Sequence, residues 1–158
     1  MEKITADKNS NWTYGLAWSP KLETGYEEID SQHKQLFILV SDLIESCQKN
    51  EAAVTIEEVL YFLLDYTEKH FSDEEKISLR YRYPHHDEHK EMHGVLKKNV
   101  AVFIEQYKKN GFSKILFSAL TKMIVKWLIN HIQGEDFKIA NHIKEYQKNY
   151  KIYLPMFV

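Results

Sequence analysis

Apolar side chains recur at steps of three and four residues over long stretches of this chain, and only five glycines and three prolines interrupt them. Such a period is typical of helices that pack through one face, whereas the strict alternation of strands is scarce here. We therefore predict an all-α protein. Four main helices with short connections favour an up-down-up-down four-helix bundle, with an N-terminal arm before it and a short C-terminal helix after it.

Local signals mark the expected helix ends. Thr55 followed three residues later by Glu58 forms a capping-box pattern, which predicts the start of the second helix. Pro84 disfavours helix in the residue before it, so a third helix is expected to start nearby, and glycines 111 and 134 are expected to end the third and fourth helices. The expected helices run from after Asp30 to about 48, from Thr55 to about 79, from His85 to about 109, from Ser113 to about 133 and from Phe137 to about 147.

The length of 158 residues suits one domain, residues 1–158, with one core. We divide it into an arm at 1–28, the bundle at 29–133, and the C-terminal helix and tail at 134–158. A single cysteine, Cys47, excludes an internal disulfide and fits a reducing compartment. We expect Cys47 to be a small core residue near a helix end.

Charge and hydropathy limit the expected partners. The formal net charge is −2, and the basic residues are scattered among acidic ones, so the chain has no basic stripe that would follow a phosphate backbone. The N-terminus has no apolar signal-like run, and the longest purely aliphatic or aromatic run, residues 59–64, is too short to span a bilayer. We expect a cytoplasmic protein that binds neither nucleic acid nor a membrane.

Candidate metal ligands recur on all four expected bundle helices. Residues four apart lie on one helix face, so His70 with Glu74, and likewise His89 with His93, offer two donor groups to one small volume. Imidazoles with a minority of carboxylates suit iron, zinc, copper or nickel, and five histidines with two carboxylates exceed one tetrahedral site. The count therefore predicts a dinuclear centre. The seven candidates are His33, His70, Glu74, His89, His93, His131 and Asp136.

Some candidate ligands have neighbouring residues that could bind a metal in their place. Glu75 adjoins Glu74, and His85 and His86 precede His89 at helical spacing. A lone histidine near an apolar face is more often an ordinary hydrogen-bonded residue, but this reading weakens when all seven candidates fall on inward faces. His131 and Asp136 are five apart, which is wrong for a continuous α-helix. A backbone break at Gly134 would let Asp136 fold back beneath His131, whereas Glu135 would remain solvated.

Four stretches of the chain carry the candidate ligands together with characteristic neighbours. The first contains Trp18, Gly25 and the run Ile-Asp-Ser-Gln-His-Lys at 29–34, and the second is His-Phe-Ser-Asp-Glu-Glu at 70–75. The third is Tyr-Pro at 83–84 with the two histidines at 89 and 93, and the fourth is Trp-Leu-Ile-Asn-His-Ile at 127–132 with the aspartate at 136. Together these stretches resemble the hemerythrins, most closely the bacterial single-domain ones. One departure is Ser78, where the family often has a methionine.

The resemblance implies a non-haem di-iron centre. His89, His93 and His131 would hold one iron, and His33 and His70 the other. Glu74, Asp136 and a solvent-derived oxo or hydroxo group would bridge them. The second iron would keep an open position, where the family binds dioxygen. Apolar residues within a turn of the ligands would exclude water and form an oxygen pocket, although ordinary core packing explains them equally well: Leu36, Phe37, Trp127, Leu128 and Ile132.

The leading hypothesis is reversible dioxygen binding for storage, delivery or sensing, without enzyme activity and with an unknown oxygen-consuming protein as recipient. The alternative is a di-iron redox enzyme that handles oxygen, peroxide or nitric oxide. Ferritin-like di-iron enzymes carry paired Glu-x-x-His motifs, and none of the eight histidines here has a glutamate three residues before it. A structural zinc bundle with the same ligands is a third possibility, and it would be colourless.

Overall fold

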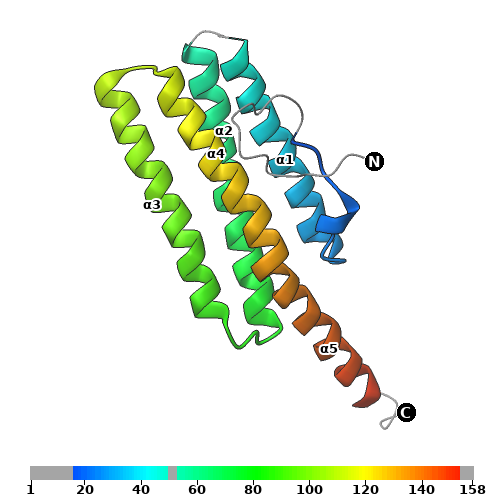
Figure 1. The fold of residues 1–158 in the computed structure, drawn as a ribbon. Coiled ribbons are helices and arrows are strands. Elements are labelled where there is room, and N and C mark those ends of the chain that lie inside the picture. Colours follow the sequence, from blue (N-terminus) through cyan, green and yellow to red (C-terminus); the bar gives the residue numbers. More distant parts are fainter. Residues whose placement is uncertain (1–15, 50–52, 154–158) are drawn as a thin grey trace.

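The computed structural model describes residues 16–49 and 53–153. These residues form helices and connections without a strand, as the sequence predicts (Figure 1). Four long helices pack side by side, and short connections join successive helices, so the predicted bundle is confirmed. The elements are a 3-10 turn at Pro20–Leu22, α1 at Glu27–Gln48, α2 at Ala53–Arg80, α3 at His86–Asn110, α4 at Lys114–His131, a π-helical turn at Ile132–Asp136, and α5 at Phe137–Tyr153.

Helix α1 begins three residues before Asp30, earlier than the sequence predicts. The Asp30 carboxylate lies in the first turn and accepts hydrogen bonds from the backbone N–H of Thr24 at 2.7 Å and of Gly25 at 2.9 Å. The Thr24 hydroxyl donates to the same carboxylate at 2.8 Å. Gly25 has a φ of 80°, which a glycine adopts without strain. Asp30 therefore fixes the entry to the helix from inside its first turn.

Between the end of α1 and the start of α4, the helix ends agree with the sequence except at the start of α2. Because α2 already includes Ala53, Thr55 lies inside the helix, and the predicted capping box at its start is wrong. Ser113 caps α4, where its hydroxyl accepts from the N–H of Leu116 at 3.4 Å. Gly111 follows α3 with a φ of 75°, and its N–H donates to the Tyr107 carbonyl at 2.8 Å, as expected for a left-handed stop.

The prediction that Gly134 ends the fourth helix is wrong. Backbone hydrogen bonds pass from α4 through the π-helical turn into α5, which reaches Tyr153 rather than about 147. Figure 1 shows α5 continuing the line of α4 past the end of the bundle. The stretch Lys114–Asn149 is long and apolar enough to cross a membrane, a property shared by core helices, and 44% of its most apolar window is buried. The absence of a membrane partner stays a prediction.

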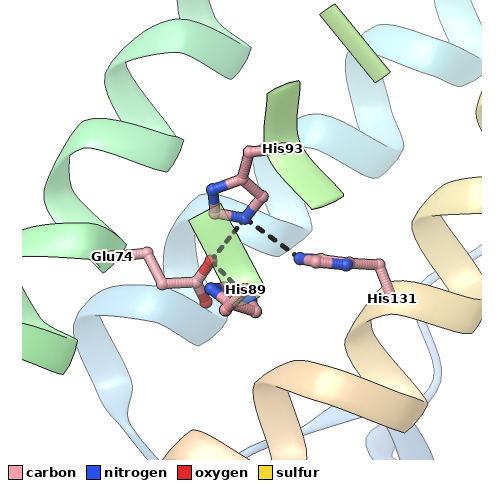
Figure 2. A group of neighbouring side chains, drawn as sticks. All are labelled: Glu74, His89, His93 and His131. Carbon is pink, nitrogen blue, oxygen red and sulfur yellow. Dashed lines mark hydrogen bonds and ion pairs between the residues drawn. The ribbon is translucent and has the colours of Figure 1, made fainter. Parts of the chain in front are cut away.

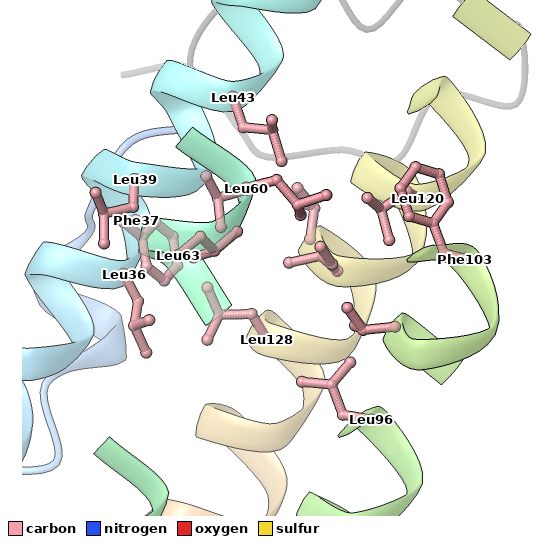
Figure 3. Close-up of a cluster of buried hydrophobic side chains, with 14 of the residues drawn as sticks. Leu36, Phe37, Leu39, Leu43, Leu60, Leu63, Leu96, Phe103, Leu120 and Leu128 are labelled. Carbon is pink, nitrogen blue, oxygen red and sulfur yellow. The ribbon is translucent and has the colours of Figure 1, made fainter. Parts of the chain in front are cut away.

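Apolar side chains from all four bundle helices fill the interior (Figure 3). Most of them lie on the same side of the candidate ligands, since they follow the ligands along α1 and α3 and precede them along α2 and α4. A smaller apolar cluster packs on the other side, where Ile29, Ile77, Ile139, Ile143 and Tyr83 meet. The ligands therefore lie between two water-excluding layers. The side chain of Cys47 lies outside the described residues. The larger cluster includes the buried side chains of Leu36, Phe37, Val40, Leu43, Leu60, Leu63, Leu96, Val100, Phe103, Phe117, Leu120, Ile124 and Leu128.

Candidate metal centre

The structure brings all seven predicted ligand residues together inside the bundle. Each has at most 5% of its surface exposed. Helix α1 supplies one of them, α2 and α3 supply two each, and α4 and the π-helical turn supply one each. Such burial of polar groups is costly unless they find partners, so the cluster needs a chemical explanation. In chain order the residues are His33, His70, Glu74, His89, His93, His131 and Asp136.

The ligand atoms of the cluster fall into two groups that share Glu74. One group consists of Glu74, His89, His93 and His131 (Figure 2). In each group the ligand atoms lie within 4.8 Å of one another. His93 Nε2 lies 3.3 Å from Glu74 Oε2 and 3.0 Å from His131 Nε2. The second group contains Glu74 with His33 and His70, and its His70 Nε2 lies 4.0 Å from Glu74 Oε2. The three-histidine group and the two-histidine group are therefore adjacent.

Asp136 also faces both groups, one oxygen to each. Its Oδ1 atom lies 3.1 Å from His89 Nε2 and 3.2 Å from His131 Nε2, in the three-histidine group. Its Oδ2 atom lies 3.2 Å from His33 Nε2, in the two-histidine group. Two carboxylates that each reach both groups are arranged as bridging ligands are in a dinuclear centre.

The π-helical turn explains how Asp136 reaches this position. The N–H of Phe137 bonds to the Ile132 carbonyl, five residues earlier, so the turn contains one more residue than an α-helical turn. The extra residue rotates Asp136 onto the face of His131 without the predicted break in the helix. Glu135 points elsewhere and accepts from Lys138 Nζ at 2.9 Å.

The other competing residues also lie outside the two groups. Glu75 contacts the far side of His93, with Oε1 3.1 Å from Nδ1. His85 is exposed and lies 3.6 Å from Glu88. His86 Nδ1 lies 2.6 Å from the Ser78 hydroxyl, which is fully buried. The geometry thus favours the ligand set chosen from the sequence.

Several polar atoms of the cluster have no hydrogen-bond partner among the described residues. They include His33 Nε2, Glu74 Oε2 and Asp136 Oδ2, all of which point into the cluster. His33 Nε2 and Asp136 Oδ2 are 3.2 Å apart but lack the angles of a hydrogen bond. Each such buried atom costs about 1–3 kcal/mol when it stays unpaired. Cations placed between these lone pairs would remove that cost, so the residues fit a pair of metal ions.

Burial also gives three of the histidines the protonation state that metals require. It is the main cause that lowers the pKa of His70 to about 3, of His93 to about 2 and of His131 to about 4. These imidazoles are therefore neutral near pH 7 and can donate lone pairs. Burial, and then the charge of Asp136, raises the pKa of Glu74 well above its usual value. A carboxylate in that position favours a nearby cation.

Burial, the largest single influence, raises the pKa of Asp136, but the interactions with His131, His33 and His89 together outweigh burial and hold that pKa well below the usual range. The two carboxylates thus differ in how readily they lose a proton. A positive charge placed between them would stabilise the ionised form of both, which is the form that ligates metals.

Aromatic rings line the cluster. Phe71 stacks on His93 with ring centres 3.7 Å apart, and the half-buried Trp127 stacks on His131 at 4.1 Å. The ring centres of Trp18, which precedes α1, and His33 are 6.3 Å apart. The sequence alone did not single out Phe71 as part of the site, although its position directly after the candidate ligand His70 indicates that it lies nearby. The predicted oxygen-pocket residues Leu36, Phe37, Leu128 and Ile132 are buried and Trp127 is half-buried, but their role in holding oxygen stays a prediction.

A four-helix bundle whose buried histidines and carboxylates converge in two adjacent groups defines a class of helical proteins with a site suited to metal ions. The family described as "Hemerythrin HHE cation binding domain" matches residues 24–143. The chain belongs to the hemerythrin family, as its motifs predict.

Several curated relatives cover most of this chain. A bacteriohemerythrin of Stenotrophomonas maltophilia (strain R551-3) is 30% identical over 129 residues, which is 82% of each chain. A myohemerythrin of Theromyzon tessulatum is 34% identical over 121 residues, 77% of this chain and 88% of the relative. The hemerythrin subunit beta of Lingula anatina is 31% identical over 122 residues, 77% of this chain and 90% of the relative.

Proposed function

We propose that the chain binds dioxygen reversibly at a pair of iron ions, for oxygen storage, delivery or sensing. Oxygen binding is typical of the hemerythrin family, to which the chain belongs. The observation that carries the proposal is the unequal division of the ligands, because three histidines adjoin the shared carboxylates on one side and only two on the other. A metal ion on the side with fewer protein ligands would keep a coordination position open for a small exogenous ligand.

The residues have distinct parts in this proposal. His89, His93 and His131 would hold one ion, His33 and His70 the other, and Glu74 and Asp136 both. Two iron ions held in this way would supply two electrons to one bound dioxygen and take them back on its release. Neutral imidazoles add less negative charge than carboxylates would, so the site should stabilise highly oxidised iron weakly and favour binding over oxygen activation.

The apolar surroundings would protect the reduced site. Leu36, Phe37, Leu128 and Ile132 are buried, and Trp127 covers one face of His131. Such residues exclude water and so slow the irreversible oxidation of a ferrous site. We further propose that the protein works in the cytoplasm, where a reducing environment would restore oxidised iron, and that its recipient is an oxygen-consuming protein.

The experiment that tests the proposal is a visible spectrum with an iron determination. Protein reduced without air is exposed to oxygen and then returned to anaerobic conditions. We expect about two irons per chain, from the ligand count, and a colour that appears in oxygen and fades on its removal. Irreversible oxidation would instead favour a di-iron enzyme that handles oxygen, peroxide or nitric oxide. A colourless, zinc-loaded protein would refute the proposal.

A further inference from the structure

Two of the cluster histidines have a hydrogen-bond partner on the ring nitrogen that faces away from the cluster. His70 Nδ1 lies 2.9 Å from Gln32 Oε1, and His93 Nδ1 lies 3.1 Å from Glu75 Oε1. Gln32 is buried and Glu75 is largely so, with 18% of its side chain exposed. The two partners differ in charge, because one is an amide and the other a carboxylate.

The orientation of the Gln32 amide follows from its other neighbour. Gln32 Nε2 donates to Asp73 Oδ2 at 3.0 Å, and Asp73 also accepts from Lys69 at 3.1 Å and Lys76 at 3.2 Å. The two lysine ammonium groups can only donate, so the Asp73 carboxylate acts as a hydrogen-bond acceptor in this cluster. The amide nitrogen of Gln32 must therefore face Asp73, and its oxygen must face His70.

These contacts determine where each imidazole carries its proton. An amide oxygen beside His70 Nδ1 requires that nitrogen to donate, which leaves the lone pair on Nε2, the atom that faces Glu74. Glu75 imposes the same tautomer on His93, whose Nε2 faces Glu74 and His131. A hydrogen bond to the far nitrogen also restricts rotation of the ring.

The difference in charge has an electronic consequence. A carboxylate that accepts from an imidazole N–H makes the other nitrogen a stronger donor than an amide does. The three-histidine group, which contains His93, is therefore the more electron-rich. The exposed Lys90 lies 3.6 Å from Glu75 and offsets its charge only in part.

We propose that Gln32 and Glu75 are positioning residues that hold His70 and His93 in the metal-binding tautomer and make the two metal positions electronically unequal. The inference rests on the proposed iron pair, but it concerns the ligand environment and not the binding of oxygen. In this arrangement the ion of the three-histidine group is the more easily kept oxidised, and the ion of the two-histidine group is the more easily kept reduced.

Three variants test the electronic part through the midpoint potential of the iron-loaded protein. Glu75→Gln keeps a hydrogen-bond acceptor but removes the charge, so we expect a more positive potential. The double variant Gln32→Glu with Asp73→Asn moves a carboxylate next to His70 without changing the net charge, so we expect a more negative potential. Glu68→Gln is the control, because Glu68 is on the same helix as Glu75 but is exposed and pairs with Lys97. We expect no change from it.

Cobalt binding to the metal-free protein tests the positioning part without iron or oxygen. Gln32→Leu and Glu75→Leu should each weaken one of two Co²⁺ binding steps by about 10- to 100-fold, while Glu75→Gln stays within a few-fold of wild type. Helix content measured by circular dichroism identifies any variant that unfolds. If the leucine variants bind both Co²⁺ ions as wild type does, or if the two charge variants shift the potential in the same direction or not at all, the inference is wrong.

The two proposals fail in different experiments. If the wild-type protein does not bind oxygen reversibly but the potentials shift as described, the proposed function is wrong and the positioning role stands. If oxygen binding is reversible and the potentials do not move, the positioning role is wrong and the proposed function stands.

Discussion

His131 Nε2 and Asp136 Oδ1 lie 3.2 Å apart although five residues separate them in the sequence. In an uninterrupted α-helix, residues five apart face directions that differ by about 140°. The π-helical turn at Ile132–Asp136 adds one residue to the helix and removes most of that difference. Such turns are rare and often occur at functional sites, so this irregularity is further support for a functional site at Asp136.

Asp136→Ala should remove metal binding far more than the neighbouring change Glu135→Ala. Asp136 has one oxygen toward each group, whereas Glu135 pairs with Lys138 beside the cluster. We expect the Asp136 variant to hold fewer than half of the wild-type metal ions, and the Glu135 variant to hold the wild-type number. Metal analysis after dialysis measures both. Equal losses would show that Asp136 is not a ligand.

His70→Ala should lower the iron content or abolish oxygen binding while the helices persist. His70 is one of only two histidines in the two-histidine group, so its loss leaves His33 and the carboxylates there. Iron analysis, the oxygen-dependent spectrum and circular dichroism together measure the effect. His142→Ala is a suitable control, because that histidine bonds to the Tyr81 carbonyl and lies outside both groups. Full iron content with unchanged oxygen affinity would refute the assigned role.

The metal-free protein should lose stability as the pH falls from about 6.5 to about 4. Free imidazoles bind protons below pH 6.5, but the pKa is about 3 for His70, about 2 for His93 and about 4 for His131. The unfolded chain therefore gains these protons first. The raised pKa of Glu74 acts in the opposite direction and offsets one of the three.

The net difference is two protons, so the free energy of unfolding should fall by about 3 kcal/mol per pH unit at most. Urea denaturation of chelator-treated protein at pH 7, 6 and 5 measures this. A stability that rises toward pH 5 would contradict the expected sign.

Ser78→Ala should destabilise the fold by about 1 kcal/mol. The buried Ser78 hydroxyl donates to the Glu75 carbonyl at 2.9 Å or pairs with His86 Nδ1 at 2.6 Å, and the change leaves His86 without that partner. A double-mutant cycle with His86→Ala isolates the contact. If the two changes add without any coupling, the Ser78–His86 contact contributes nothing.

The sequence predicted those features that depend on helical periodicity and residue type. The inward positions at His33, His89 and His93 follow from steps of three and four, and the structure buries all three. The start of α1 was misplaced because Asp30 resembles a capping residue, while its actual bonds reach back to Thr24 and form only in the folded chain.

Features that depend on contacts between helices were harder to predict from the sequence. The sequence indicated that the backbone departs from an α-helix near Gly134, but hydrogen-bond geometry decides between a break and a π-helical turn. The contact between Gln32 and His70 joins residues 38 apart, so only the packing of α1 against α2 reveals it. The one local sign of this contact in the sequence is that Gln32 directly precedes the candidate ligand His33.

The position of the two shared carboxylates has a consequence for how metal content affects the stability of the fold. One ion in the three-histidine group would leave Asp136 Oδ2 and the His33 imidazole buried without a hydrogen-bond partner, as they are in the metal-free protein. Only the second ion removes that penalty. A half-filled molecule should therefore resist unfolding less well than a filled one, and full stability should require both ions.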